Sequence, residues 1–158
     1  MNLILIRHAK SSWKTNVDDH NRPLSPRGIE DANKVFKELK NNLVSDSIIW
    51  CSTAKRTRQT AQIFAEICGY NFKDFQLKNE LYTFNGHDLL QILKSNTHQN
   101  LIVFCHNNAI TDIVNAYGNF IIENVPTCGV VILTFETENF LKTRGIISKT
   151  IFPKDLKL

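Results

Sequence analysis

The sequence lacks any long apolar run. No stretch approaches the roughly 18 apolar residues that a membrane-spanning helix needs, and the start of the chain has no secretory signal pattern. Blocks of like charge are also absent, because the 19 basic and 15 acidic residues are spread along the chain. We therefore expect a cytoplasmic protein that binds neither a membrane nor nucleic acid, and whose net charge of +4 suits a small anionic ligand better.

Cysteine is scarce, and its spacing fits no metal site. The sequence has no C-x-x-C pair and no histidine at zinc-ligand spacing, so we expect free thiols, no metal and no cofactor. A phosphatase with a cysteine nucleophile needs an arginine six positions after that cysteine, but those positions hold three threonines and one aspartate. This excludes cysteine-based phosphoryl chemistry. The four cysteines are Cys51, Cys68, Cys105 and Cys128.

Short apolar runs alternate with helical periods along the chain. Together with 158 residues, 42% of them apolar, this alternation predicts a single α/β domain over residues 1–158 with a mostly parallel sheet and crossover helices. Two late apolar runs form a hairpin that turns at residues 136–139 and supplies an antiparallel edge strand. The expected strands are 3–6, 47–51, 75–77, 101–105 and the hairpin within 130–151.

Several residues mark where helices begin and end. Ser25 followed by Pro26 predicts the start of one helix, and Ser52 or Thr53 the start of a second helix that ends at Gly69. Apolar residues at spacings of three and four predict the buried face of the first helix. That face comprises Ile29, Ala32, Phe36, Leu39 and Leu43.

Polar side chains follow directly after three of the apolar strands. In an open parallel sheet the carboxyl ends of the strands meet at one rim, where ligands bind. If the three strands are neighbours, two arginines and two histidines come together there. The residues concerned are Arg7 and His8, then Ser52 and Arg56, then His106, Asn107 and Asn108.

These groups predict a phosphoryl pocket. Four groups that can carry positive charge, with no carboxylate beside them, would repel one another unless an anion binds. Helix N-termini near residues 54 and 107 would add backbone N–H donors, and the arginine fork matches phosphate oxygens. Two neighbouring arginines also disfavour a proton on His8, and a neutral imidazole is a nucleophile toward phosphorus. We expect His8 to be the nucleophile and His106 a donor to the phosphoryl oxygens.

Each of these residues taken alone also fits a structural role. An arginine at a strand end is commonly a surface ion-pair partner, and an isolated histidine is commonly part of the packing, which is what we expect of His20, His87 and His98. Their arrangement after three consecutive strong strands favours the catalytic interpretation.

Three segments together resemble the histidine phosphatase superfamily, which includes the cofactor-dependent phosphoglycerate mutases. They read "LIRHAKSSW", "CSTAKRTRQTA" and "VFCHNNA". The sequence is most similar to small SixA-type phosphohistidine phosphatases, through "RHAKSSW", "RPLSPRG" at 22–28 and "PT-x-G" at 126–129. The resemblance implies a three-layer α/β sandwich with helices on both faces of the sheet and a covalent phosphohistidine intermediate.

The resemblance also implies roles for individual residues. Arg7, His8, Arg56 and His106 fall on the catalytic core of the family. Glu80 falls where members often place a proton-donating carboxylate, although it also fits an ordinary loop carboxylate. The other positions are expected to bind phosphate or line the mouth of the site, with Ser52 also suited to capping a helix. These are Ser52, Asn107 and Arg22.

The sequence thus predicts a phosphatase that transfers a phosphoryl group to His8 and then to water. A phosphohistidine in another protein is the expected substrate, because the chain is too short for the insertion that caps the pocket of longer relatives. One alternative is a phosphomonoesterase for a small metabolite. A second is a non-catalytic module that binds phosphate or a phosphoprotein.

Overall fold

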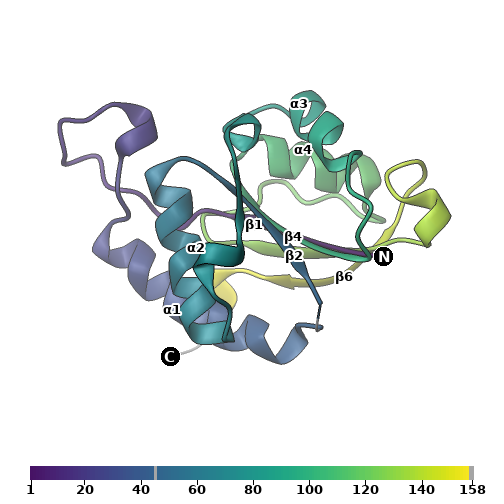
Figure 1. Ribbon diagram of the computed structural model, residues 1–158, viewed down its shortest axis with the longest axis horizontal. Coiled ribbons are helices and arrows are strands. Elements are labelled where there is room, and N and C mark those ends of the chain that lie inside the picture. The colour runs from purple at the N-terminus through teal and green to yellow at the C-terminus, as the bar shows by residue number, and fades with distance from the viewer. Residues whose placement is uncertain (45, 157–158) are drawn as a thin grey trace.

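The computed structural model describes residues 1–44 and 46–156, and a six-stranded sheet forms its centre (Figure 1). The strand order across the sheet is β3-β2-β4-β1-β5-β6. None of the helices in the described part of the chain is long and apolar enough to cross a membrane. In chain order the strands are β1 (Asn2–Arg7), β2 (Ile48–Ser52), β3 (Gln76–Lys78), β4 (Asn100–Cys105), β5 (Val130–Thr134) and β6 (Ile146–Ile151).

The sheet is mixed, as predicted. β1, β4, β2 and β3 pair in parallel, whereas β5 pairs antiparallel with both β1 and β6. The late hairpin is therefore confirmed, with antiparallel pairing on both sides of β5. Its connection is longer than predicted, since β5 ends at Thr134 and β6 begins at Ile146. A 3-10 turn at Thr137–Asn139 occupies the expected turn position.

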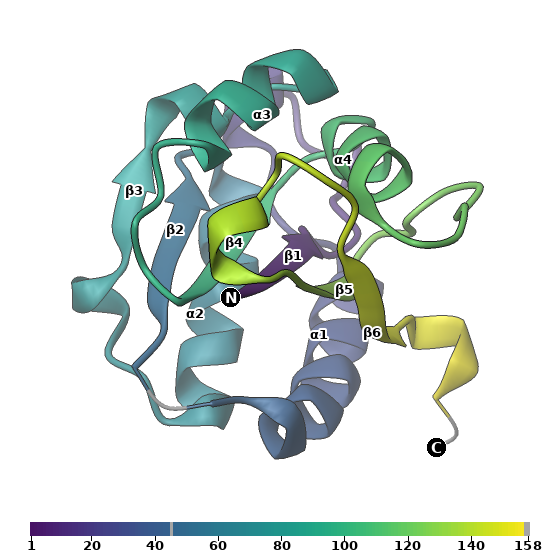
Figure 2. The same cartoon turned by 90° about the vertical axis from the view of Figure 1, so that its right-hand side faces the viewer.

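Two helices cover each face of the sheet (Figure 2). β1 shows why the central strands are mainly apolar: Ile4 and Ile6 pack into the core on one face, and Leu3 and Leu5 into the core on the other. This arrangement confirms the three-layer α/β sandwich. The helices are α1 (Pro26–Leu39) and α2 (Lys55–Cys68) on one face, and α3 (Gly86–Leu93) and α4 (Ala109–Tyr117) on the other.

α1 begins where the sequence predicts. The Ser25 hydroxyl accepts a hydrogen bond from the backbone N–H of Gly28 at 3.0 Å, and Pro26 is the first helical residue. Ala32, Phe36 and Leu39 are buried as expected, but Ile29 is 47% exposed, so that prediction was wrong. The buried face also includes Gly28, Asp31 and Val35, which centres it away from Ile29. Leu43 lies beyond the helix and packs at the edge of the core.

α2 begins later than the sequence predicts, and without a side-chain cap. Its N-cap residue is Ala54, so the prediction of Ser52 or Thr53 was wrong. The Ser52 hydroxyl hydrogen-bonds with His106, and the Thr53 hydroxyl with His20 and Asn79. Both hydroxyls therefore bind distant residues instead of the backbone N–H groups at the start of the helix. The predicted end is confirmed, because Gly69 adopts the left-handed conformation with φ of 79°.

The start of α1 packs directly on the segment that follows β1. The backbone carbonyl of Lys10 accepts hydrogen bonds from both the backbone N–H and the hydroxyl of Ser25, at 2.9 and 3.1 Å. A Cβ atom on Gly28 would lie 2.2 Å from the same carbonyl oxygen. Only glycine allows this approach, which fixes the position of residues 8–10.

We predict that Gly28→Ala destabilises the protein, although alanine normally favours a helix over glycine. The added methyl group must displace the Lys10 backbone, at a cost of about 1–3 kcal/mol in the free energy of unfolding. Chemical denaturation of the two proteins measures this cost. Lys37→Ala, on the exposed face of α1, serves as the control and should change stability by less than about 0.5 kcal/mol. Unchanged stability of Gly28→Ala would contradict the close approach.

Candidate active site

A pocket of about 330 Å³ opens beside the carboxyl ends of β1, β4 and β2. The predicted neighbours are thus adjacent, and the polar residues after them share one rim. The pocket is lined by five of the predicted site residues, which are Arg7, His8, Arg22, Arg56 and Asn107.

His8 is held in one orientation and one tautomer. Its Nδ1 atom lies 2.7 Å from the carbonyl oxygen of Ala9, and a carbonyl only accepts, so Nδ1 carries the proton. Nε2 then keeps its lone pair and accepts a hydrogen bond from the Arg56 Nε–H at 3.3 Å. Burial, together with the charges of Arg56, Arg7 and Arg22, lowers the pKa of His8 to about 3 despite its bond to Ala9. The ring is neutral near pH 7, with its unprotonated nitrogen toward the guanidinium.

His106 packs beside His8, is also neutral and does not line the pocket. Its ring is fully buried, its centroid is 5.3 Å from that of His8, and its Nε2 lies 2.8 Å from the Ser52 hydroxyl. The rings of Tyr82 and Phe84 contact it edge-on. Burial, and secondarily the electrostatic repulsion of an added proton by His8 and Arg56, lowers the pKa of His106 to about 2.

Arg56 and Arg7 supply the positive charge. Arg56 is 2% exposed, and its Nη1 and Nη2 atoms donate to the backbone carbonyl and the carboxylate of Asp19, at 2.7 and 3.1 Å. Arg7 donates from Nη1 to the carbonyl of Val125 at 2.9 Å. Its buried Nε has no partner within residues 1–44 and 46–156. Burial, and secondarily Arg56, lower the pKa of Arg7.

Asp19 corrects the expectation that no carboxylate lies beside these cations. Its side chain accepts hydrogen bonds from Arg56, from Arg22 and from the hydroxyl of Tyr82. Partial burial acts to raise the pKa of Asp19, but the bonds from Tyr82 and Arg56 outweigh it and hold that pKa well below its usual range. Asp19 is therefore a carboxylate that partly neutralises the cluster.

Besides His106, three predicted residues do not present their side chains to the pocket as expected. Ser52 is fully buried and holds His106. Glu80 is exposed in the 3-10 turn Asn79–Leu81 and does not line the pocket. Asn107 does line it, but its side-chain oxygen accepts from Thr111 and its amide donates to Asn124, so the side chain fixes the start of α4.

The sequence interpretation missed three residues of the site, whereas Trp13 lies beside the pocket as expected. The two aspartates before Arg22 were the available signal for Asp19, since a group of cations requires a counter-charge. Trp13 lies in the quoted "RHAKSSW" segment, and the guanidinium carbon of Arg22 sits 3.6 Å from the centroid of its ring. Nothing in the spacing of the sequence marks the aromatic residues after β3. The three missed residues are Asp19, Tyr82 and Phe84.

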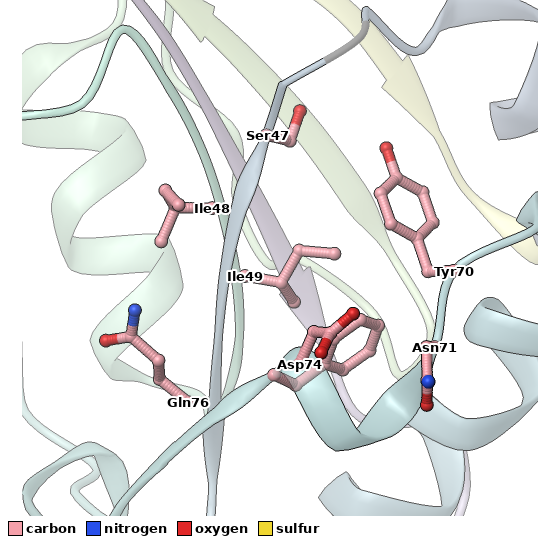
Figure 3. Close-up of a pocket in the computed structure, with 8 residues that line it drawn as sticks. Ser47, Ile48, Ile49, Tyr70, Asn71, Asp74 and Gln76 are labelled. Carbon is pink, nitrogen blue, oxygen red and sulfur yellow. The ribbon is translucent and has the colours of Figure 1, made fainter.

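A separate pocket lies at the opposite end of β2 (Figure 3). Ile48 and Ile49, the first residues of that strand, line it together with Tyr70 and Asp74. It contains a carboxylate and no cationic side chain, so it does not suit a phosphoryl group. Among the described residues, no group of three or more histidine, cysteine or acidic side chains is placed to hold a metal ion.

Comparison with known proteins identifies the family. The profile of the histidine phosphatase superfamily (branch 1) matches residues 3–82, which include Arg7, His8 and Arg56. The chain belongs to this superfamily. The resemblance predicted from the three sequence segments is therefore confirmed.

Sequence relatives match part of the chain. An uncharacterized protein of Mycobacterium tuberculosis is 47% identical over 55 residues, which is 35% of this chain and 35% of that protein. An uncharacterized chloroplastic protein of Arabidopsis thaliana is 43% identical over 70 residues, or 43% of this chain and 32% of that protein. The chain thus spans about a third of the length of the curated relatives it matches.

Several solved structures are similar over nearly the whole chain. The protein histidine phosphatase SixA complexed with tungstate has a TM-score of 0.80 at 16% identity, over 99% of this chain and 100% of that one. A putative phosphohistidine phosphatase SixA from Agrobacterium tumefaciens has a TM-score of 0.77 at 21% identity, over 95% and 97%. For a phosphoserine phosphatase from Entamoeba histolytica the values are 0.64 and 17%, over 94% and 95%. These likenesses confirm the phosphoglycerate mutase-like fold.

We predict that stability falls as the pH is lowered from about 6.5 toward 3. The folded-state pKa values of His8 and His106 are about 3 and about 2, against a reference value of 6.5, so the unfolded chain binds more protons in this window. The contribution of these two histidines to the free energy of unfolding is therefore complete above pH 6.5 and is lost as the pH falls toward 3. At pH 5, each histidine lowers the free energy of unfolding by about 2 kcal/mol relative to pH values above 6.5.

Thermal unfolding between pH 7 and 4.5 tests this prediction. His8→Gln should flatten the dependence on pH, whereas His87→Gln, at an exposed position in α3, should leave it unchanged. If His8→Gln unfolds with the pH dependence of the wild-type protein, His8 is not held neutral by the fold.

Proposed function

We propose that the protein is a phosphatase that takes a phosphoryl group onto Nε2 of His8 and transfers it to water. The observation that carries this proposal is the state of His8. Its ring is buried and neutral, its proton is fixed on Nδ1 by the Ala9 carbonyl, and its free nitrogen faces a guanidinium. The superfamily, whose members are generally phosphatases with a phosphohistidine intermediate, agrees with it.

In the proposed first step, the hydrogen bond from the Arg56 Nε–H to Nε2 is lost as the phosphoryl group enters, and the freed lone pair forms an N–P bond while the bond from phosphorus to the leaving group breaks. The leaving group takes that electron pair and later a proton. Arg7, Arg22 and Arg56 bind the phosphoryl oxygens and stabilise the charge that spreads over them. Water then attacks phosphorus, the N–P bond breaks, and His8 regains its lone pair.

Ser52, His106 and Asn107 assist this pocket in the proposal. If the Ser52 hydroxyl donates to Nε2 of His106, the proton of that neutral ring lies on Nδ1, which has no partner in the described part of the chain. His106 then has an N–H to offer to a phosphoryl oxygen. Only the backbone N–H of Asn107 is left for the phosphate, because its side chain is engaged.

The lack of a well-placed acid to protonate the leaving group favours a substrate with an N–P bond. Glu80 is the predicted acid, but it is exposed and lies outside the pocket lining, and Asp19 is held as a carboxylate. An alkoxide leaving group needs a good acid, whereas the ring nitrogen released from phosphohistidine is already basic. A poorly placed acid is therefore less of a handicap for phosphohistidine than for an alkyl phosphate.

The rim of the pocket supports a protein as the partner that carries the phosphoryl group. Trp13 and Phe84, which line the pocket, are 78% and 47% exposed, so the mouth is open and has aromatic surface around a cationic floor. A side chain projecting from another protein can enter such a site. The proteins with similar folds include a protein histidine phosphatase SixA and a putative phosphohistidine phosphatase SixA, whose names agree with this substrate.

A small-metabolite phosphatase is the second candidate. The pocket volume of about 330 Å³ suits a small ligand, and the fold is also similar to that of the Entamoeba phosphoserine phosphatase.

The deciding experiment compares wild type with His8→Ala on two substrates. One is a phosphocarrier protein bearing phosphohistidine, and the other is an aryl phosphate. We expect wild type to prefer the phosphocarrier, the variant to lose at least about a thousandfold in rate, and the trapped wild-type enzyme to carry an acid-labile, base-stable phosphoryl label. Equal rates for the two proteins would refute the role of His8. Turnover of only the aryl phosphate would refute the phosphohistidine substrate, and binding without turnover would identify a non-catalytic module.

We also predict that Asp19→Asn tightens the binding of inorganic phosphate by about fivefold, because it removes an anion that repels the phosphate with about 1 kcal/mol. Asparagine keeps an oxygen that accepts from the arginines. Inhibition by phosphate, or its calorimetric binding, measures the change. Asp18→Asn, at the exposed neighbouring position, should alter binding less than twofold. Weaker binding by Asp19→Asn would mean that Asp19 acts mainly by holding Arg22 and Arg56 in place.

A further inference from the structure

We infer that Thr60 is a positioning residue for His8 and acts through the backbone of Ala9. This inference rests on the proposed function, because it concerns the geometry of the nucleophile. Thr60 lies in α2, does not line the pocket and does not contact the His8 ring through any hydrogen bond. Its role follows from the two hydrogen bonds of its hydroxyl.

The Thr60 hydroxyl joins the two segments that carry the site. Its Oγ1 atom lies 2.8 Å from the carbonyl oxygen of Arg56 and 3.0 Å from the backbone nitrogen of Ala9. A hydroxyl has one proton to donate, so it donates to the Arg56 carbonyl and accepts from the Ala9 N–H. The residue after the nucleophile is thereby tied to the helical turn that bears the guanidinium.

Ala9 transmits this constraint to the His8 ring. The carbonyl of Ala9 is the acceptor that keeps the His8 proton on Nδ1, at 2.7 Å. Both Ala9 and Thr60 are fully buried, so water cannot replace a lost hydroxyl without opening the structure. Without its partner, the Ala9 N–H is left unpaired, and Ala9 can relieve this only by rotating. That rotation moves the carbonyl that fixes the tautomer of His8.

The same turn of α2 also holds the second loop of the site. Gln59, next to Thr60, accepts a hydrogen bond through Oε1 from the backbone N–H of Leu24 at 2.8 Å. Leu24 follows the segment that contains Asp19 and Arg22. Adjacent residues of one helix therefore fix both segments that face Arg56.

Thr57 provides a matched control one turn earlier in α2. It is fully buried like Thr60, but its hydroxyl has no hydrogen-bond partner among the residues that the structure describes. Replacing either threonine by valine exchanges a hydroxyl for a methyl group of similar size. Only at Thr60 does this exchange break bonds to the site.

The test is a kinetic comparison of Thr60→Val, Thr60→Ser and Thr57→Val on the better of the two phosphorylated substrates. We expect Thr60→Val to lower kcat about ten- to hundredfold, since small displacements of a reacting group have effects of this size. KM and inhibition by inorganic phosphate should change less than about twofold, because the arginines stay in place. Thr60→Ser, which keeps the hydroxyl, should recover most of the activity, and Thr57→Val should resemble wild type.

A second readout does not depend on activity. In protein labelled with ¹⁵N on histidine, long-range proton–nitrogen correlation spectra report which ring nitrogen of His8 carries the proton. We expect Nδ1 protonation in wild type, Thr60→Ser and Thr57→Val, and a mixture of tautomers in Thr60→Val. Thr60→Ala, which removes the hydroxyl without placing a methyl against the Ala9 N–H, should give the same mixture if Thr60→Val does not fold.

These outcomes separate the two proposals. Absence of phosphatase activity in wild type would overturn the proposed function, while the spectra would still test Thr60. A wild-type tautomer and wild-type kcat in both Thr60→Val and Thr60→Ala would overturn the role of Thr60. Equal losses in Thr57→Val and Thr60→Val would also overturn it, because they would reflect general packing of α2.

Discussion

The guanidinium of Arg56 lies beneath the pocket with each of its three nitrogens hydrogen-bonded. Nε donates to His8, and Nη1 and Nη2 donate to Asp19. A cation that is 2% exposed needs such partners, because an unpaired buried charge costs several kcal/mol. Burial of Arg56 therefore requires the loop that carries Asp19 to fold against it. The neutral state of His8 has the same origin, since burial beside this charge disfavours an imidazolium.

The fold was accessible from the sequence because its signals are local. A strand buried on both faces must be apolar throughout, as in β1 and β4, and the cap at Ser25 and the left-handed Gly69 each involve only neighbouring residues. Residues that follow such strands must lie at the sheet rim. Arg7 and His8 could be placed at the site on this ground before any contact was known.

The remaining parts depend on contacts between distant segments. Ser52 has the chemistry of a helix cap, but it binds His106 instead, and no local pattern decides between these partners. Asp19 meets Arg56 only after α2 packs beside the loop. Nothing in the local sequence distinguishes Thr60 from the other residues of its helix, because its bond to Ala9 joins distant segments. Glu80 was assigned through resemblance alone, and its exposed position shows how little a carboxylate's place in the sequence says about its depth in the fold.

The central position of β1 also bears on when the site can exist during synthesis. Leu3 pairs with Leu101 on one side and Leu133 on the other, so β1, which ends at Arg7 just before His8, pairs with strands that are synthesised much later. Such long-range pairing slows folding and places it late. β5 must leave the ribosome before β1 can pair on both sides and the pocket around His8 can form. An incomplete chain would thus contain Arg7 and His8 without the formed pocket around them.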